Sequence, residues 1–566
     1  MDPAFAFQQD RAIQVGHHRT VGLEPVRPDE ALQGGDVVIL LHHSAPAPGR
    51  PHDSLMSAER LGSVTCTSSN MNETELKFEV PPAAAAAIES SLRSLGAGRA
   101  SIESRYFDTA QGHLAAAGMS LRLRKVGNRW EQTVKAPGEH AVDRLEETVA
   151  RPGRFGAPGP IVDPALHHGT RAGAGLEALV DKCAAEGGLL AEVYRSVVVR
   201  RAVEIYTRDA RVEVAFDRGR LVAGDLELPI CEVEYELKAG EAIALLEFCR
   251  PAIDAHGAWL STLSKAARGD ALVARGGSFV ACKAQAPRLR RDMGFAVLRR
   301  AVLGACLDQA LANASVLAGG QQDDEVIHQL RVGLRRLRTA TRELRTGKQA
   351  AAWEAVVADV FRCLGDYRDG VTVAAVLGAE LAEAGAPEPV LRASAPARSP
   401  VDVVRRADFQ HALLDVLCEL VSTTAPAIDA PADDSRAAVG RRLDALHAAL
   451  KKGAKRFESL SEDDQHGVRK RLKRLRYLAE LVGSLYGKRP VERYLEALRP
   501  AQDELGHYLD VVVGIRLARE RAEAGDPQAW FNVGWLSAQR PRGVKRCGKA
   551  LRKAADASPF WRHGRG

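Results

Sequence analysis

Charged side chains occupy every second position in three short segments of this 566-residue chain. The alternating charged residues are Glu73, Glu75, Lys77, Arg122, Arg124, Glu232, Glu234 and Glu236. In a β-strand, side chains at i, i+2 and i+4 share one face, so each segment has one charged face and one apolar face. A closed barrel with a polar lumen would gather such faces into one channel. The pattern therefore predicts a channel that holds a divalent cation on its carboxylates and a polyanion on its bases.

Composition and periodicity divide the chain into four parts. Residues 1–70 are rich in Pro, Gly, His and Ser and predict a disordered extension. Residues 71–275 mix strand and helix patterns, residues 276–288 predict a linker, and residues 289–566 are helical in period. The predicted fold class is α+β, with an antiparallel sheet followed by an all-α domain.

The overall composition narrows the class of protein. An apolar fraction of 46% and a charged fraction of 27% are typical of soluble globular proteins. The cysteines show no CxxC pair and no zinc-ligand spacing, which favours a reducing compartment. No long uninterrupted apolar run and no secretory signal pattern are present, so we expect a cytoplasmic protein with no membrane partner.

The five carboxylates of the first and third segments form a candidate metal site. Like charges on one strand face raise each other's pKa unless a cation is present, and Mg²⁺ takes a few carboxylates together with substrate phosphates. The candidate ligands are Glu73, Glu75, Glu232, Glu234 and Glu236. The alternative is a solvated face paired with neighbouring Lys and Arg.

Basic residues accompany these acids on strand-like segments. Arginine binds phosphate oxygens with two parallel hydrogen bonds and lysine acts as a point charge, so a mixed set suits a chain of phosphates. The candidate substrate-binding residues are Lys77, Arg122, Arg124, Lys135, Arg144, Arg200 and Lys265.

A family resemblance follows from these motifs. The segments ETELK (73–77), LRLR (121–124), QTVK (132–135), CEVEYELKAG (231–240) and SKAARG (264–269) resemble the CYTH superfamily, or triphosphate tunnel metalloenzymes. The match is greatest with bacterial inorganic triphosphatases. It implies an eight-stranded antiparallel tunnel that binds triphosphate with Mg²⁺ or Mn²⁺. The resemblance assigns catalytic roles to Glu73, Glu75, Lys77 and Glu234, and leaves open which acid positions the attacking water. Glu146 and Asp217 also match acidic positions of the family's motifs, without an assigned role.

The helical half contains an internal repeat. A pattern of His followed by bases at spacings of three and four residues begins at His328 and recurs at His466, and LGDYRD (364–369) recurs as LGHYLD (505–510). Each pattern places its bases on one helix face. Two facing stripes of this kind would line a groove for a linear phosphate chain. The candidate residues are His328, Arg331, Arg335, Arg338, Arg342, His466, Arg469, Lys470, Lys473 and Arg476.

Three other interpretations of the repeat are a solvent-facing basic helix, nucleic-acid binding and metal binding by the histidines. Few acids lie four residues from the bases to compensate them, and an aromatic fraction of 5% offers few rings for stacking on bases. No second His or acid sits at ligand spacing beside either histidine. We therefore expect no nucleic-acid partner and no metal here.

The motifs HQLRVGLRRLR (328–338), HGVRKRLKRLRYLAEL (466–481) and SPFW (558–561) resemble the CHAD family. This resemblance implies a tandem helical-bundle domain that binds inorganic polyphosphate. Together the two resemblances predict a metal-dependent inorganic triphosphatase, with tripolyphosphate and long-chain polyphosphate as partners and association with polyphosphate granules. The alternatives are a polyphosphate-binding protein with an inactive tunnel, and a tunnel enzyme acting on an organic triphosphate such as thiamine triphosphate. The oligomeric state stays open.

Overall fold

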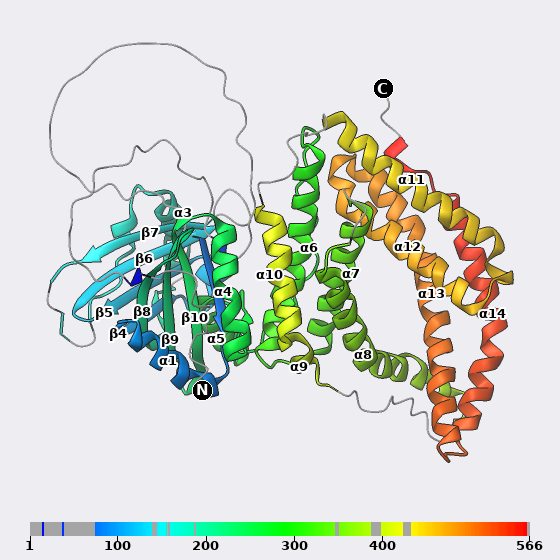
Figure 1. Ribbon diagram of the computed structural model, residues 1–566, viewed down its shortest axis with the longest axis horizontal. Helices are drawn as coiled ribbons and strands as arrows, with labels where there is room; N and C mark the ends of the chain where they lie inside the picture. The colour runs from blue at the N-terminus through cyan, green and yellow to red at the C-terminus, as the bar shows by residue number, and fades with distance from the viewer. Residues whose placement is uncertain are drawn as a thin grey trace, which may run out of the picture. The chain divides into compact units, whose positions relative to one another are not determined.

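The computed structural model divides into two compact units, Met1–Ser278 and Phe279–Gly566 (Figure 1). It describes residues 14–15, 37–38, 74–137, 144–153, 155–156, 159–185, 188–345, 350–386, 398–422 and 432–562. Of the predicted extension 1–70, only two strands, β1 (Gln14–Val15) and β2 (Val37–Val38), fall within the described residues.

An antiparallel sheet forms the first unit. Its strands follow the order β11-β3-β10-β9-β8-β4-β5-β6-β7, while β1 pairs with β8 and β2 pairs with β3 off this path. The bounds are β3 Thr74–Glu79, β4 Gly98–Asp108, β5 Ser120–Val126, β6 Arg129–Pro137, β7 Arg144–Arg151, β8 Ala191–Tyr206, β9 Ala210–Ala223, β10 Leu226–Gly240 and β11 Trp259–Leu260. The antiparallel sheet followed by helices confirms the predicted fold class.

The eight strands β3–β10 match the predicted number, but the predicted closed tunnel differs from the structure. The two-residue β11 adds a ninth strand, and the path ends at β11 and β7 with no pairing between them in the described residues. A closed barrel requires hydrogen bonds between its two edge strands. Alternating charges along a strand indicate only that one face of the sheet is polar and enclosed. A strongly twisted open sheet can enclose that face by curling.

Helix α4 (Ala242–His256) packs on the apolar side of this sheet. On β10, Tyr235 alternates with the glutamates and packs edge-on against Phe78 of β3 and Phe248 of α4. Burial of these rings turns the intervening carboxylates to the other face. The helices of this unit are η1 Pro82–Ala84, α1 Ala85–Ser94, α2 His113–Ala116, η2 Pro164–His167, α3 Arg171–Ala185, α4 Ala242–His256 and α5 Lys265–Arg275.

The second unit is helical throughout its described residues. Its elements are α6 Phe295–Ala318, α7 Asp324–Glu343, α8 Trp353–Glu383, α9 Pro400–Arg405, α10 Ala407–Val421, α11 Ala432–Arg456, η3 Phe457–Ser459, α12 Glu462–Val482, η4 Gly483–Leu485, α13 Lys488–Glu523, α14 Ala529–Ala555 and η5 Phe560–Arg562. The repeat predicted from the sequence places its two basic motifs on α7 and α12. Both helices begin with a side-chain cap, from Asp323 and Ser461. α12 runs through Gly467 without a break.

The two copies share one packing pattern. α10 packs against α6 and α8, and α14 packs against α11 and α13, so α6, α7, α8 and α10 correspond to α11, α12, α13 and α14. Figure 1 shows α13 and α14 as a long antiparallel pair. α7 also packs against α12, which joins the copies.

Residues 279–289, most of the predicted linker, bond to the helical unit. Asn313 of α6 exchanges hydrogen bonds with the backbone of Cys282 at 3.0 and 2.9 Å, and Gln321 does the same for Phe279 at 2.7 and 2.8 Å. α6 itself is long and apolar enough to cross a membrane, but 83% of its most apolar window is buried inside the structure.

Candidate active site and candidate anion-binding groove

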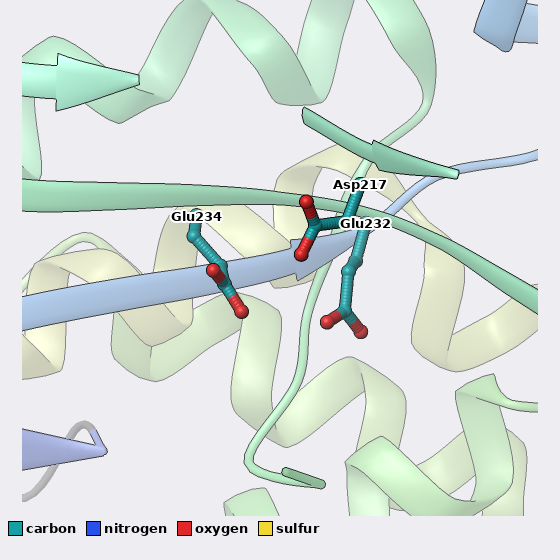
Figure 2. A group of neighbouring side chains, drawn as sticks. All are labelled: Asp217, Glu232 and Glu234. Atoms are coloured by element: carbon teal, nitrogen blue, oxygen red, sulfur yellow. The ribbon is translucent and has the colours of Figure 1, made fainter. Parts of the chain in front are cut away.

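Three carboxylates cluster on the polar face of the sheet (Figure 2). Asp217 lies on β9, and Glu232 and Glu234 lie on β10. Asp217 is opposite Glu232 in the strand register, so both side chains leave the same face. One ligand oxygen from each carboxylate lies within 4.8 Å of the others. This spacing suits three ligands of one hard divalent cation.

Lys265 lies among these acids. Its Nζ is 2.7 Å from Oδ2 of Asp217 and 2.8 Å from Oε1 of Glu234, and it also contacts Glu232. Arg200 on β8 donates from Nε and Nη2 to the two oxygens of Asp217, each at 2.7 Å, and contacts Glu234 as well. The acids are therefore compensated by cations from a strand and a helix.

These ion pairs fix the charges of the site. Burial alone favours the neutral form of Glu234, but Lys265 and Arg200 hold the pKa of this carboxyl well below its usual range. Burial also opposes the ionisation of Asp217, whose pKa is lowered by the same two cations. Burial disfavours the charged form of Lys265, yet its acidic neighbours raise its pKa well above the ordinary value. Both acids and the lysine are therefore ionised at neutral pH.

Helix α5 places two cations at the site. Ser264 caps its first turn by accepting a hydrogen bond from the backbone N–H of Ala267, and Lys265 follows immediately. One turn later, Arg268 donates to Glu232 at 3.3 Å. The helix can approach β8 because Gly269 has no side chain, since a Cβ there would come within 2.0 Å of the Tyr194 ring. Arg268 is not among the residues predicted for the site.

Glu232 is fully buried and is surrounded by cations. Lys77 on β3, itself 5% exposed, lies with its Nζ 3.6 Å from Oε2 of Glu232. With Lys265 and Arg268, this makes three cations around one carboxylate. Lys77, predicted to act on substrate, thus contacts an acid of the site.

The sheet curls enough for distant strands to face each other. Glu75 on β3 interacts electrostatically with Lys135 on β6, although β10, β9, β8, β4 and β5 separate the two strands along the sheet. Burial and the nearby Glu234 raise the pKa of Glu75 to about 8. Glu75, Glu234, Lys77, Lys135 and Lys265 therefore share one enclosed face.

The bases of β5 and β6 form the other side of that face. Lys135 lies 2.5 Å and Arg122 lies 3.5 Å from the carboxylate of Glu146 on β7. Burial disfavours ionised Glu146, but Lys135 and Arg122 lower its pKa. Burial and the neighbouring Arg122 lower the pKa of Arg124, which donates to Ser104 at 3.3 Å. Arg124 also pairs with Glu131 at 3.7 Å, so three bases face two carboxylates here.

Two predicted side chains lie outside the described residues, and a third has a partner of its own. Glu73 lies outside the described residues, and the side chain of Arg144, at the start of β7, is also outside them. Glu236 is on the same face of β10 but pairs with Lys238 at 2.6 Å. Asp217 takes the third position of the cluster instead.

In the helical unit, three predicted arginines surround one aromatic ring. The guanidinium carbons of Arg331, Arg335 and Arg338 on α7 lie 5.2, 4.9 and 5.4 Å from the ring centroid of Phe361 on α8. Cation–π contacts of this kind stabilise each guanidinium over the ring face. Phe361 therefore orders these three arginines of α7. The periodicity of α7 alone does not predict this ring, because it lies on another helix.

The stripes of α7 and α12 converge. Lys473 on α12 is largely buried and interacts with Arg335 and Arg331 across the two copies, and with Arg469 on its own helix. Burial and these three cations lower the pKa of Lys473 to about 6, and Asp510 of α13 opposes the shift. The carboxylate of Asp510 thus lies among bases from both copies.

Further contacts join the two helices. Arg335 donates to the hydroxyl of Tyr477 at 3.5 Å, and Arg474 donates to Glu343 at 3.2 Å. Of the other predicted residues, Arg342 and Lys470 are exposed, and His328 and His466 are half-buried. Arg476 pairs with Glu480 at 2.7 Å and also contacts Gln502, so its charge is compensated.

Comparison with known families assigns both units. The CYTH domain profile matches residues 71–269, which hold the acidic cluster, and the CHAD domain profile matches residues 301–519, which hold the convergent stripes. The chain is a CYTH domain followed by a CHAD domain. The curled sheet is thus the CYTH domain, and α7, α8, α12 and α13 belong to the CHAD domain.

Individual relatives match parts of the chain. The inorganic triphosphatase of Haemophilus influenzae is 29% identical over 164 residues, which make up 29% of this chain and 44% of that protein. The CHAD domain structure from Ricinus communis covers 50% of this chain and 99% of its own, with 26% identity and a TM-score of 0.42. A putative adenylyl cyclase from Hippeastrum, described as having a dominant triphosphatase activity, covers 37% and 97%, with 16% identity and a TM-score of 0.25.

Proposed function

We propose that the CYTH domain is a metal-dependent inorganic triphosphatase that hydrolyses tripolyphosphate to pyrophosphate and phosphate. The observation that carries the proposal is the joint presence, on one enclosed face, of three clustered carboxylates and a row of bases from β5, β6 and β8. Partial similarity to an inorganic triphosphatase supports the same reaction class.

The acidic cluster fits a divalent cation. Asp217, Glu232 and Glu234 offer oxygen ligands from a water-poor site, with Glu75 beside them. Mg²⁺ and Mn²⁺ prefer such ligands together with substrate phosphates. When bound, the ion supplies neutralisation of phosphate charge. We propose Asp217 in place of Glu236 as the third protein ligand.

The bases of the face would bind and orient the substrate. Arg122, Arg124 and Lys135 carry the positive charge that is not matched by the acidic cluster, and they lie across the curled face from it. Phosphoryl transfer needs little covalent chemistry from the protein, because positioning and electrostatic stabilisation lower its barrier. The reaction proposed here therefore requires no protein nucleophile.

For the CHAD domain we propose binding of long-chain polyphosphate in the groove between α7 and α12. The convergence of Arg331, Arg335, Arg469 and Lys473 supports it, because an anion between the two helices would stabilise cations that otherwise repel one another. Binding there would raise the local concentration of polyphosphate for the linked CYTH domain.

Phosphate release from tripolyphosphate tests the proposed reaction. We would compare wild type with Glu234→Gln, in the presence of Mg²⁺, Mn²⁺ or a chelator, with ATP and thiamine triphosphate as other substrates. Glu227→Gln is the matched control, because Glu227 lies on the same strand, is exposed and pairs with Arg220 away from the cluster. Metal-dependent release that Glu234→Gln abolishes and Glu227→Gln retains is expected. Equal release by both variants, or release in chelator, would refute the proposal.

A further inference from the structure

Helix α14 carries a basic stripe that does not line the groove between α7 and α12. The helix has seven Lys and Arg residues and no acidic residue. Its buried face is formed by small and apolar residues such as Leu536, Cys547 and Leu551. Arg542, Lys545, Lys549 and Lys553 are all exposed and follow one another at spacings of three and four, so they share one face. We call these four residues the outer stripe.

The other arginines of α14 are bonded to neighbouring elements. Arg540 contacts Glu462 of α12 at 2.8 Å, and Arg546 contacts Glu504 of α13 at 3.2 Å. Arg552 contacts Glu458 of η3 at 2.9 Å.

The outer stripe differs from these arginines. Among the described residues, no carboxylate lies within 4 Å of a charged nitrogen in it. Its charges therefore face solvent uncompensated.

Helix α11 extends this basic surface. Glu458, which follows the end of α11, lies beside Gly548 on the buried side of α14 and pairs with Arg552. Lys451, Lys452, Lys455 and Arg456, in the last two turns of α11, are all exposed. The adjoining ends of the two helices thus form one basic face, made of these four residues and the outer stripe. Three acids that contact α14, Glu458, Glu462 and Glu504, are already paired with Arg552, Arg540 and Arg546.

The internal repeat provides a comparison within the same chain. The counterpart of α14 in the first copy is α10, which has no Lys or Arg and three acidic residues, Asp408, Asp415 and Glu419. The counterpart of α11 is α6, whose last twelve residues also contain no Lys or Arg. Both copies keep the stripe that lines the groove, but only the second has the basic face. The fold itself therefore does not require the basic face. Repulsion between the like charges of that face lowers the stability of the domain.

We propose that the basic face of α11 and α14 binds a second stretch of long-chain polyphosphate, outside the groove between α7 and α12. This inference rests on the proposed polyphosphate binding of the CHAD domain. Lysines at i, i+4 and i+8 lie about 6 Å apart along a helix, which suits a linear chain of evenly spaced charges. Lysine binds phosphate as a point charge without further geometry. No aromatic side chain lies between Arg542 and Lys553 for stacking on nucleic-acid bases.

The test compares binding of short-chain and long-chain polyphosphate at several salt concentrations. The full-length triple variant Lys545→Gln/Lys549→Gln/Lys553→Gln should bind long chains more weakly. If polyphosphate releases counterions as a single-stranded nucleic acid does, the salt dependence (log affinity against log salt) should be about 2 shallower. It should bind short chains like wild type, because these fit in the groove. The matched control, Lys488→Gln/Arg489→Gln/Arg493→Gln, removes the same charge from exposed positions at the start of α13.

Each result has one meaning. Equal weakening by the control variant would assign the effect to net charge and overturn the inference. Unchanged long-chain binding in the triple variant, with loss of binding to duplex DNA, would overturn it in favour of a nucleic-acid surface. A groove variant, Arg335→Gln/Lys473→Gln, separates the two proposals. If only the groove variant loses polyphosphate binding, the groove is the binding site and the proposal for the basic face is refuted. If only the triple variant loses it, the proposal for the groove is refuted.

Discussion

Arg200 on β8 holds Asp217 on β9 through two parallel hydrogen bonds of 2.7 Å, and Asp217 in turn contacts Lys265. A carboxylate held by a guanidinium fork on one side and an ammonium on the other has a fixed orientation. This arrangement keeps the acid ionised in a buried position and directs it toward Glu232 and Glu234.

Arg200→Lys should retain the charge at this position but lose the fork. We expect kcat on tripolyphosphate to fall by about a hundredfold, as when one preorganised donor is removed from an active site, while Tm changes little. Steady-state kinetics and thermal unfolding would measure both. Arg220→Lys, at an exposed position of β9, is the control and should keep wild-type kcat.

Glu232→Gln should destabilise the CYTH domain. Glu232 is fully buried, and its loss of charge leaves Lys77, Lys265 and Arg268 facing one another. Removing one partner of a buried ion pair costs about 3–5 kcal/mol, which urea unfolding of the metal-free protein would detect. The exposed Glu227→Gln should stay within about 0.5 kcal/mol of wild type. An unchanged unfolding free energy would show that these cations are compensated elsewhere.

Lys473 should make polyphosphate binding depend on pH. Its pKa of about 6 means that the free protein holds it mostly uncharged above pH 6. An anion stabilises the charged form and raises this pKa, so binding takes up a proton. Affinity should therefore rise as pH falls from 8 to 6, by at most about tenfold per pH unit, and level off below. Isothermal titration calorimetry in buffers of different ionisation enthalpy would count the protons.

Lys473→Arg is the informative variant for this effect. Arginine stays charged over the whole range, so the affinity between pH 6 and 8 should become flat. The pKa of His466 is lowered by burial and by nearby Lys470 and Arg469, which disfavour its charged form. A pH slope that survives in Lys473→Arg would assign the proton to another group.

Phe361→Leu should weaken the groove without unfolding it. Three guanidinium groups lie within 5.5 Å of the ring centroid, and each such contact contributes about 0.5–1 kcal/mol at an accessible site. Leucine keeps apolar bulk but has no π face, so affinity for polyphosphate should fall while circular dichroism stays unchanged. Phe361→Tyr keeps the ring and should bind like wild type. Equal affinity of all three proteins would show that the ring does not order the arginines.

Much of the fold follows from alternation and period. The strands β3, β5 and β10 lie where charged and apolar residues alternate, and the two basic helices lie where the repeat places them. Closure of the tunnel is not seen among the described residues, because alternation fixes which face is polar but not whether the edge strands meet.

The site itself was predictable only in part. Asp217 joins Glu232 through the register of β9 on β10, which one sequence does not determine. Arg268 could have been predicted, because it lies one helical turn after Lys265 and so shares its face. Phe361 could not, since its position over α7 depends on how two helices pack.

Lysine and arginine already occupy the places where a cation would be expected. Four positive side chains, Lys77, Arg200, Lys265 and Arg268, contact the three carboxylates of Asp217, Glu232 and Glu234. Because the carboxylates are already neutralised in this way, binding of a bare metal ion would stabilise them little. A triphosphate carries negative charge to which the ammonium and guanidinium groups can bind instead. Metal and substrate would then enter most readily as a single complex, and the empty protein would keep its shape in the absence of either.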